Sequence, residues 1–405
     1  RGIHGAVIPG CPETYQSSRQ SEQQQSQQEQ GQSQQEQAQS QQSYRHGDRH
    51  QKVRPLKQGD LVAIPVGVAN WFYNDGDTQL VLVSLLDTSN NENQLDDRRR
   101  TFYLGGNPQQ GRQQGSSQGA EQESSQGAEQ EEQESSPYGR GAEQESSSNN
   151  ILKFRDELLS EALGVSKETA RKLKGENDDR GSIVRVENEL QVIRPPRVGE
   201  EREQPGVVQN EEQTRQSDIE SFCNVQLRIN IDKPARADVY NPRAGRITRV
   251  NSRKLSILKD LRLNVERVVL YRNALLAPRW NLNAHSVIYA TRGDAEVEIV
   301  GNNQQPIYSG RLRQNQLLIV PQNFAVVIKA GDQGFEWVSF KTNDNAIVNS
   351  IAGRNSVFQA LPEGVLRNAF RISSEEAKQL KNNREEEREL FAPRFESQKR
   401  EYASA

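Results

Sequence analysis

The sequence predicts a mainly β protein built from one unit that occurs twice, each time as a β-barrel followed by a pair of helices. Short apolar runs broken by Gly, Pro, Asn and Asp, such as "DLVAIPVGVANWFYNDGDTQLVLVSLLDT", are typical of antiparallel barrels and sandwiches. The second observation is internal duplication. "GDLVAIPVGVANW" aligns with "NQLLIVPQNFAVV", which places Pro65 on Pro321, and "LGVSKETARKLK" aligns with "FRISSEEAKQLK", which places Leu173 on Leu380.

Polar tracts separate the apolar parts and account for the low mean hydropathy of -0.90. One is Gln-rich and lies at about residues 16–44, and the other is acidic, lies at 105–150 and repeats "GAEQESS". We expect both to be disordered inserts, because segments with so little to bury cannot offset the conformational entropy lost on folding.

The helices are predicted from apolar spacing and from capping residues. In "ILKFRDELLSEALGVSKETARKLKG", apolar residues recur at helical intervals. Ser166 is a suitable N-cap for the second helix of this pair, which Gly175 ends. In the second copy, Ser373 and Glu376 have the spacing of a capping box.

These observations divide the chain into consecutive segments. The expected segments are a first barrel at 1–104 with its opening strands missing, an acidic loop at 105–150, a helical arm at 151–180, an extended linker at 181–217, a second barrel at 218–350, its helical arm at 351–391 and a polar tail at 392–405.

Charge and hydropathy argue against nucleic acid or a membrane as partners. The net charge of -3 conceals an acidic first half and a basic second half. The arginines of the basic half are scattered over strand and turn positions, which favours a solvated or inter-subunit surface over a nucleic-acid site. No stretch approaches the ~20 apolar residues of a membrane span.

Several stretches resemble the 11S (legumin-type) seed storage globulins of the cupin superfamily. "NVQLRINIDKPARADVYNPRAGRITRVNS", "PRWNLNAHSVIYATRGDAEVEIVG" and "VPQNFAVVIKAGDQGFEWVSFKTNDNA" resemble their basic chain. "GIHGAVIPGCPETYQ", "HQKVRPLKQGDLVAIPVGVANWFYND" and "NQLDDRRRTFYLGGN" resemble their acidic chain. The resemblance covers nearly all of the chain outside the polar tracts, and in this family the first barrel begins before the position of Arg1.

The resemblance implies both a fold and a role. Each copy would be a cupin domain, a jelly-roll barrel with a helical arm that contributes to trimer and then hexamer contacts. The protein would travel through the secretory pathway to the protein storage vacuole of the seed. There it would be a nitrogen and carbon reserve, degraded at germination, and many such proteins are food allergens.

The resemblance also locates the metal-binding positions of active cupins, G-x5-H-x-H-x3,4-E-x6-G and G-x5-P-x-G-x2-H-x3-N. Anchored on Gly293 and Pro321, these motifs place Arg279, Asn281, Ser286 and Val326 at the three histidines and the glutamate, and the first copy has Asn70 at its one readable histidine position. A guanidinium cannot bind a cation and valine has no donor atom. We therefore expect no metal, no cofactor and no catalytic residue.

Other chemistry finds little support in the sequence. It has no G-x-S-x-G, no P-loop and no HExxH. His285 lies beside the ligand positions and is interpreted as a core or hydrogen-bonding residue. Glu296 and Glu298 are interpreted as a solvated strand face. The alternatives to storage are a metal-dependent bicupin enzyme with altered ligands and a bicupin that binds a small ligand.

The family joins its acidic and basic chains by one disulfide, and Cys11 and Cys223 match those cysteines. Two free thiols are the alternative. An asparaginyl endopeptidase cuts the family at an Asn-Gly bond, but this chain has Gln216 and Ser217 there and contains no Asn-Gly. Asn210, in the polar linker, is the substitute site, because flexible loops are where nicking concentrates. The other possibility is a chain that stays uncut.

Overall fold

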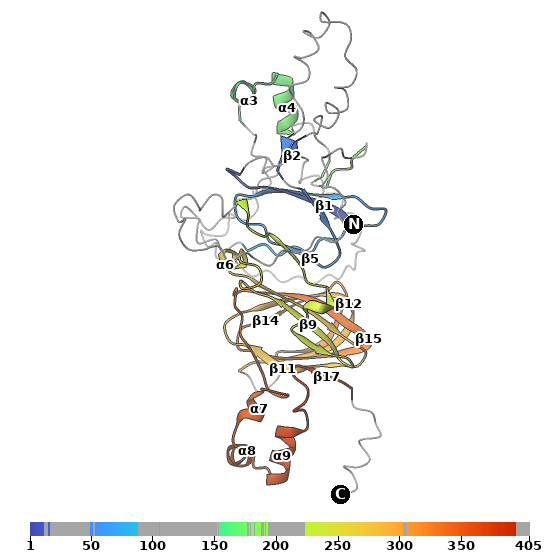
Figure 1. Ribbon diagram of the computed structural model, residues 1–405, viewed down its shortest axis with the longest axis vertical. Coiled ribbons are helices and arrows are strands. Elements are labelled where there is room, and N and C mark those ends of the chain that lie inside the picture. Colours follow the sequence, from blue (N-terminus) through green and yellow to red (C-terminus); the bar gives the residue numbers. More distant parts are fainter. Residues whose placement is uncertain are drawn as a thin grey trace, which may run out of the picture. The chain divides into compact units, whose positions relative to one another are not determined.

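The computed structural model shows a β-rich chain with a few short helices (Figure 1). It forms two compact units, one of Arg1–Val83 with Ile193–Ala405 and one of Ser84–Val192. The predicted polar inserts fall almost entirely outside the described residues. Those described are 1–11, 15–16, 49–51, 53–87, 105, 152, 154–175, 178, 180–181, 183–187, 190, 192, 223–302 and 306–393.

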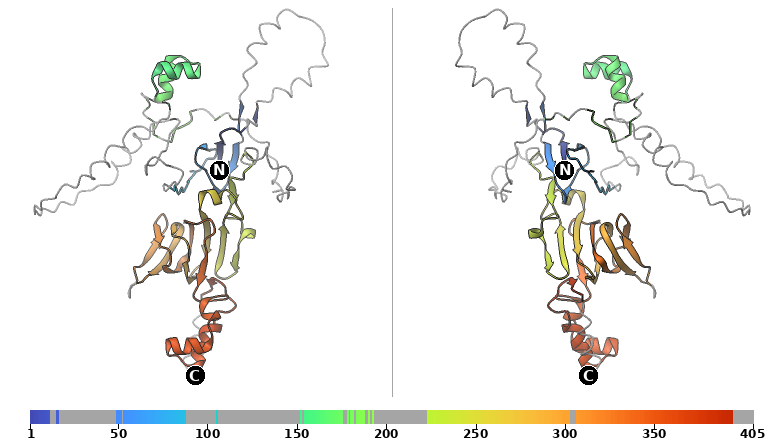
Figure 2. Two further views of the ribbon diagram at one scale, coloured as in Figure 1. Left: turned by 90° about the vertical axis from the view of Figure 1, so that its left-hand side faces the viewer. Right: turned by 90° about the vertical axis from the view of Figure 1, so that its right-hand side faces the viewer.

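The second barrel is a ten-stranded antiparallel sheet, and the yellow and orange strands of Figure 2 show it curling into two leaves. Inward side chains alternate along its strands and form one apolar core that includes Ile247, Leu276, Ile328, Phe335 and Trp337. The strands are β8 (Val239–Asn241), β9 (Gly245–Val250), β10 (Asn264–Leu270), β11 (Leu275–Asn281), β12 (Ser286–Val300), β13 (Tyr308–Arg313), β14 (Leu317–Val320), β15 (Ala325–Lys341), β16 (Val348–Ser350) and β17 (Leu390–Phe391).

Strands β12 and β15 are the longest of the sheet and pair with each other, and their pairing is interrupted near Gly293 of β12. The pairing register shifts between Gly293 and Ala295. Gly293 has a φ of +73°, and a Cβ there would lie 2.1 Å from the carbonyl oxygen of Gly334. Only glycine combines this backbone conformation with so close an approach, and the bulge lets one strand turn a corner.

The first copy contributes a smaller sheet and a strand pair that joins it to the second. Strand β1 (Gly2–Val7) lies between β4 (Val53–Leu56) and β6 (Ala69–Asn74). Strand β5 (Asp60–Val62) pairs with β7 (Arg228–Asn230), which precedes the ten-stranded sheet in the sequence. Side chains from both copies then share an apolar cluster, and the two-residue strands β2 (Tyr15–Gln16) and β3 (Arg49–His50) pair separately.

The duplication is visible in matching turns. Gly67 and Asn323 are equivalent when Pro65 is placed on Pro321, and both have positive φ, of 80° and 64°. The residue after each donates its N–H to the carbonyl of that proline, over 3.3 Å in the first copy and 3.2 Å in the second. The alignment that predicted the duplication is therefore confirmed by backbone geometry.

The helices repeat in the same way. In α4 (Lys167–Lys174), Ser166 is the N-cap and Gly175 the left-handed C-cap, as predicted. In α9 (Ser374–Asn382), Ser373 and Glu376 form the predicted capping box. The two helices begin at equivalent residues. The others described are α3 (Asp156–Leu163), α8 (Glu363–Phe370), α7 (Val357–Ala360), α6 (Leu258–Leu261) and a 3-10 turn at Pro234–Arg236.

Buried positions on the paired helices match as well. Leu159 of α3 and Leu366 of α8 are equivalent and buried, as are Ala170 of α4 and Ala377 of α9. After α9 the chain returns to the second barrel, where β17 pairs with β11. None of the described helices is both long enough and apolar enough to cross a membrane.

Candidate functional site

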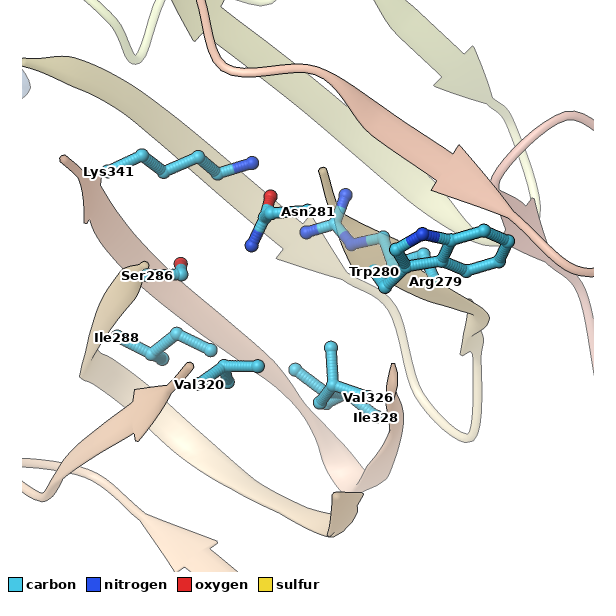
Figure 3. Close-up of a pocket in the computed structure, with 9 residues that line it drawn as sticks. All are labelled: Arg279, Trp280, Asn281, Ser286, Ile288, Val320, Val326, Ile328 and Lys341. Carbon is cyan, nitrogen blue, oxygen red and sulfur yellow. The ribbon is translucent and has the colours of Figure 1, made fainter. Parts of the chain in front are cut away.

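Four residues that the motif comparison placed at metal-ligand positions line one small pocket in the second barrel (Figure 3). The cavity measures about 10 Å³, close to the space for one water molecule. Its walls come from β11, β12, β14 and β15. The lining residues are Arg279, Trp280, Asn281, Ser286, Ile288, Val320, Val326, Ile328 and Lys341.

Strand register explains why these residues meet. Arg279 of β11 lies opposite Val326 of β15. Ser286, the first residue of β12, lies between Val320 of β14 and Lys341, the last residue of β15. Side chains alternate between the two faces along each strand, so the inward-facing side chains of several paired strands line the same pocket.

The pocket has a polar side and an apolar side. Figure 3 shows the Lys341 amine, the Asn281 amide and the Arg279 guanidinium gathered at one side, with the Ser286 hydroxyl turned toward them. The opposite side is aliphatic and consists of Ile288, Val320, Val326 and Ile328.

Behind the polar side lies a buried network of charges centred on Glu266, a β10 residue with 0% exposure. Its Oε1 accepts from an Arg279 guanidinium nitrogen at 2.5 Å, and its Oε2 accepts from Nε of Arg249 at 2.8 Å. Lys341 Nζ lies 3.6 Å from Oε2. Glu389, just before β17, pairs with both arginines. We call these five residues the buried charge network.

The network shifts the pKa of two of its members. Burial alone would raise the pKa of Glu266, but the charges of Arg279, Lys341 and Arg249 hold it well below the usual range. Burial lowers the pKa of Lys341 to about 8, with Glu266 acting against that shift and the two arginines adding to it. Glu266 is therefore an anion near neutral pH, and Lys341 is a cation that is easily deprotonated.

The donor set of this pocket does not fit a divalent metal. Two of the lining residues are cations, Val326 offers no donor, and the carboxylate that an active cupin would supply is replaced by Ser286. The described residues contain no group of three or more His, Cys, Asp or Glu side chains that could hold a metal ion. Asn70 is exposed on β6, opposite Ala6, and is not brought together with the other four positions.

The remaining predicted residues have separate places. Cys11 and Cys223 form a disulfide with a Cα–Cα distance of 5.5 Å, so the predicted bridge is present and the alternative of two free thiols is not.

His285 is exposed, and its Nδ1 accepts from the backbone N–H of Gln322 at 3.1 Å. Glu296 and Glu298 are exposed on β12. The processing candidates Asn210, Gln216 and Ser217 lie outside the described residues.

Sequence reasoning missed the buried charge network. The interpretation of the arginines as a solvated or inter-subunit surface is wrong for Arg279 and Arg267, which are 6% and 9% exposed. A usable signal was present, because Lys341 falls in phase with the buried Phe335 and Trp337 along β15. Glu266 likewise interrupts the apolar "NVERVVL" of β10. A charge in phase with a buried face indicates a partner elsewhere in the core.

Comparison with known proteins gives matches to a family model, to curated relatives and to solved structures. The Cupin family model matches residues 1–110 and 229–378. The chain is 48% identical to "11S globulin seed storage protein 1" of Carya illinoinensis, over 95% of this chain and 76% of that one. It is 43% identical to "Glutelin type-B 1" of Oryza sativa subsp. japonica, over 98% and 75%. The crystal structure of pumpkin seed globulin matches with a TM-score of 0.73 and 40% identity, over 97% of this chain and 82% of that one.

Proposed function

The chain belongs to the 11S (legumin-type) globulins, the seed storage proteins of the cupin superfamily, and from this we propose that it is a nutrient reserve without enzymatic activity. The observation that carries the second half of the proposal is the second-barrel pocket. Arg279 stands at a position where a catalytic cupin needs a neutral or anionic ligand, and Lys341 brings a second cation to the same pocket. The cavity has room for little more than one water molecule.

The composition suits a reserve of nitrogen. Gln, Asn and Arg carry additional nitrogen per residue, and many of the glutamines lie in the polar tracts at about 16–44 and 105–150. Long polar insertions in surface loops cost a fold little stability, so such tracts can expand without loss of the barrels. In this proposal the protein lies in the protein storage vacuole. It travels there through the secretory pathway, in which a disulfide can form.

The storage role makes a prediction about time course. We expect the chain to be among the abundant proteins of the mature seed and to disappear over the days of germination, before the metabolic enzymes of the same tissue. Quantitative mass spectrometry of its peptides from dry and germinating seed tests this. A level that stays low in the dry seed, or constant through germination, would contradict storage.

Self-association through the helical arms is part of the proposal. Three apolar positions are exposed on both arms at equivalent places: Leu158 with Val365, Leu163 with Phe370 and Leu173 with Leu380. Apolar residues that are exposed at equivalent places in both copies indicate a surface that contacts another protein surface. A ring in which the arm of one copy contacts the opposite arm of the next subunit would cover them all and would give a trimer, from which hexamers form.

Replacement of one of these residues tests the assembly. We expect Leu380→Asp to shift the protein from trimer and hexamer to monomer, because it places a charge in an apolar contact. Light scattering after size-exclusion chromatography measures the mass. Gln379→Asp, at the neighbouring exposed position of α9, is the matched control and should leave the assembly intact. Equal masses for the two variants would rule out the arm contact.

The proposed maturation is a single cut in the polar linker at 181–217, with Asn210 as the site for an asparaginyl endopeptidase, since Gln216 and Ser217 offer no asparagine. The cut would leave an acidic and a basic chain held by the Cys11–Cys223 bridge. The proposed domain division follows the segments predicted from the sequence, with barrels at 1–104 and 218–350 and helical arms at 151–180 and 351–391.

A further inference from the structure

We propose that the second-barrel pocket binds one small monovalent anion of the size of chloride, at the place where an active cupin would hold a metal cation. Three steps support this: the charge of the buried network, the free donors that point into the pocket, and the size of the cavity.

The buried charge network carries an excess of one positive charge. Arg249, Arg279 and Lys341 are cations, and Glu266 and Glu389 are the only carboxylates that the described residues pair with them. A net charge in a low-dielectric interior is costly unless it is compensated. A single bound anion would make the network neutral, whereas a divalent cation would triple its charge.

The pocket also contains hydrogen-bond donors without protein partners. Among the described residues, the side chains of Lys341, Asn281 and Ser286 make no hydrogen bond, and the Lys341 ammonium has only Glu266, at 3.6 Å. The side chain of Lys341 is 3% exposed. Figure 3 shows these three groups and the Arg279 guanidinium facing the same space. Ammonium, amide and hydroxyl donors around one point are the complement of an anion.

The cavity sets the size of the ligand. About 10 Å³ accommodates one water-sized sphere, so a halide ion fits with little adjustment while sulfate and phosphate do not. The aliphatic side, which includes Val326 and Ile328, suits the weakly hydrated face of a halide bound by donors on the other side. The anion would link β11, β12 and β15 at the point where their ends meet.

Chloride-dependent stability of the whole chain tests the site. Thermal unfolding is followed at constant ionic strength while sodium chloride replaces sodium gluconate, whose anion is too large for the pocket. We expect Tm to rise with chloride and to saturate, because a ligand that binds only the folded state stabilises it. Lys341→Met should weaken chloride binding about tenfold or more, because a charge-assisted contact is lost.

Lys329→Met is the matched control, since Lys329 is exposed on the same strand. It should keep the chloride response of the wild type. The response should also weaken as the pH rises through about 8, where Lys341, which faces Glu266, Glu389, Arg249 and Arg279, loses its proton. An equal chloride response in both variants, or an equal response to sulfate, would overturn the proposal.

Crystals of the wild-type chain grown in sodium bromide give a second result that does not depend on any variant. An anomalous bromide peak among Lys341, Asn281 and Ser286 is expected. A water molecule there, with bromide only on the surface, would contradict the proposal whatever the unfolding data show.

Discussion

Glu266→Gln is expected to lower the free energy of unfolding by about 3–5 kcal/mol, the usual cost of removing one partner of a buried ion pair. Glu266 is fully buried and pairs with Arg249, Arg279 and Lys341 at once, over distances of 2.5–3.6 Å. Glutamine keeps the shape but leaves three cations facing one remaining carboxylate, that of Glu389. Urea denaturation, with comparison of midpoints and slopes, measures the change.

The matched control is Glu296→Gln, at an exposed carboxylate on β12 of the same sheet. Its effect should stay within about 0.5 kcal/mol. Lys341→Met added to Glu266→Gln should recover part of the loss, because it removes one of the uncompensated cations. If Glu266→Gln and Glu296→Gln cost the same, the buried charge network does not hold the second barrel together.

The buried charge network also determines whether folding stability rises or falls as the solution becomes acidic. The pKa of Glu266 is depressed in the folded state, so it adds stability above its unfolded value of about 4.5 and loses that contribution as the pH falls through the folded value. The Glu266→Gln variant lacks the stability that the ionised Glu266 carboxylate contributes, so it should lose less stability than the wild type as the solution becomes acidic.

Local features of this chain were predictable from sequence, because they depend on neighbours a few residues away. The Ser166 cap and the Ser373–Glu376 capping box both form as predicted. A cap bonds to an N–H three residues along, so its partner is already present in the same short stretch. The internal duplication made one further feature predictable, because Pro65 and Pro321 align in the sequence and lie in the same turn in both copies.

Features that depend on distant partners were not predictable in this way. The pairing of β7 with β5 joins residues far apart in the chain, and no short pattern encodes it. The motif comparison grouped Arg279, Asn281, Ser286 and Val326, and these four residues line one pocket, because the spacing of a strand pair fixes which residues face inward. It could not supply Glu266 of β10 or Glu389, just before β17, because both lie outside the motifs and are identified only by their contacts.

Loss of the Cys11–Cys223 bridge is expected to lower the free energy of unfolding by about 2–5 kcal/mol. The bond spans 212 residues, and such a long closed loop restricts the unfolded chain strongly. The chain has only two cysteines, so reductant acts on this bond alone. The double variant Cys11→Ser/Cys223→Ser and the reduced wild type should therefore unfold at the same lower urea midpoint, and an unchanged midpoint in either would contradict the prediction.

After a cut in the linker, the same bond has a different consequence. Intact mass measured under denaturing conditions should show one species without reductant and two with it, and the fragment masses then report whether the cut lies at Asn210. Under native conditions the reduced fragments should stay together. Asp60 of β5 still pairs with Arg228 of β7 at 3.2 Å, and the backbone N–H of Ile231 still donates to the carbonyl of Gly59.

Apolar contact supports those polar ones, because Ala63 of the first copy packs with Ile231 and Leu255 in the shared cluster. The bridge therefore stabilises an association that the strand pair already makes. Separation of the reduced fragments in native mass spectrometry would show that the disulfide, and not the pairing of β5 with β7, holds the two chains together. A single mass under denaturing conditions with reductant would show that the chain is not cut.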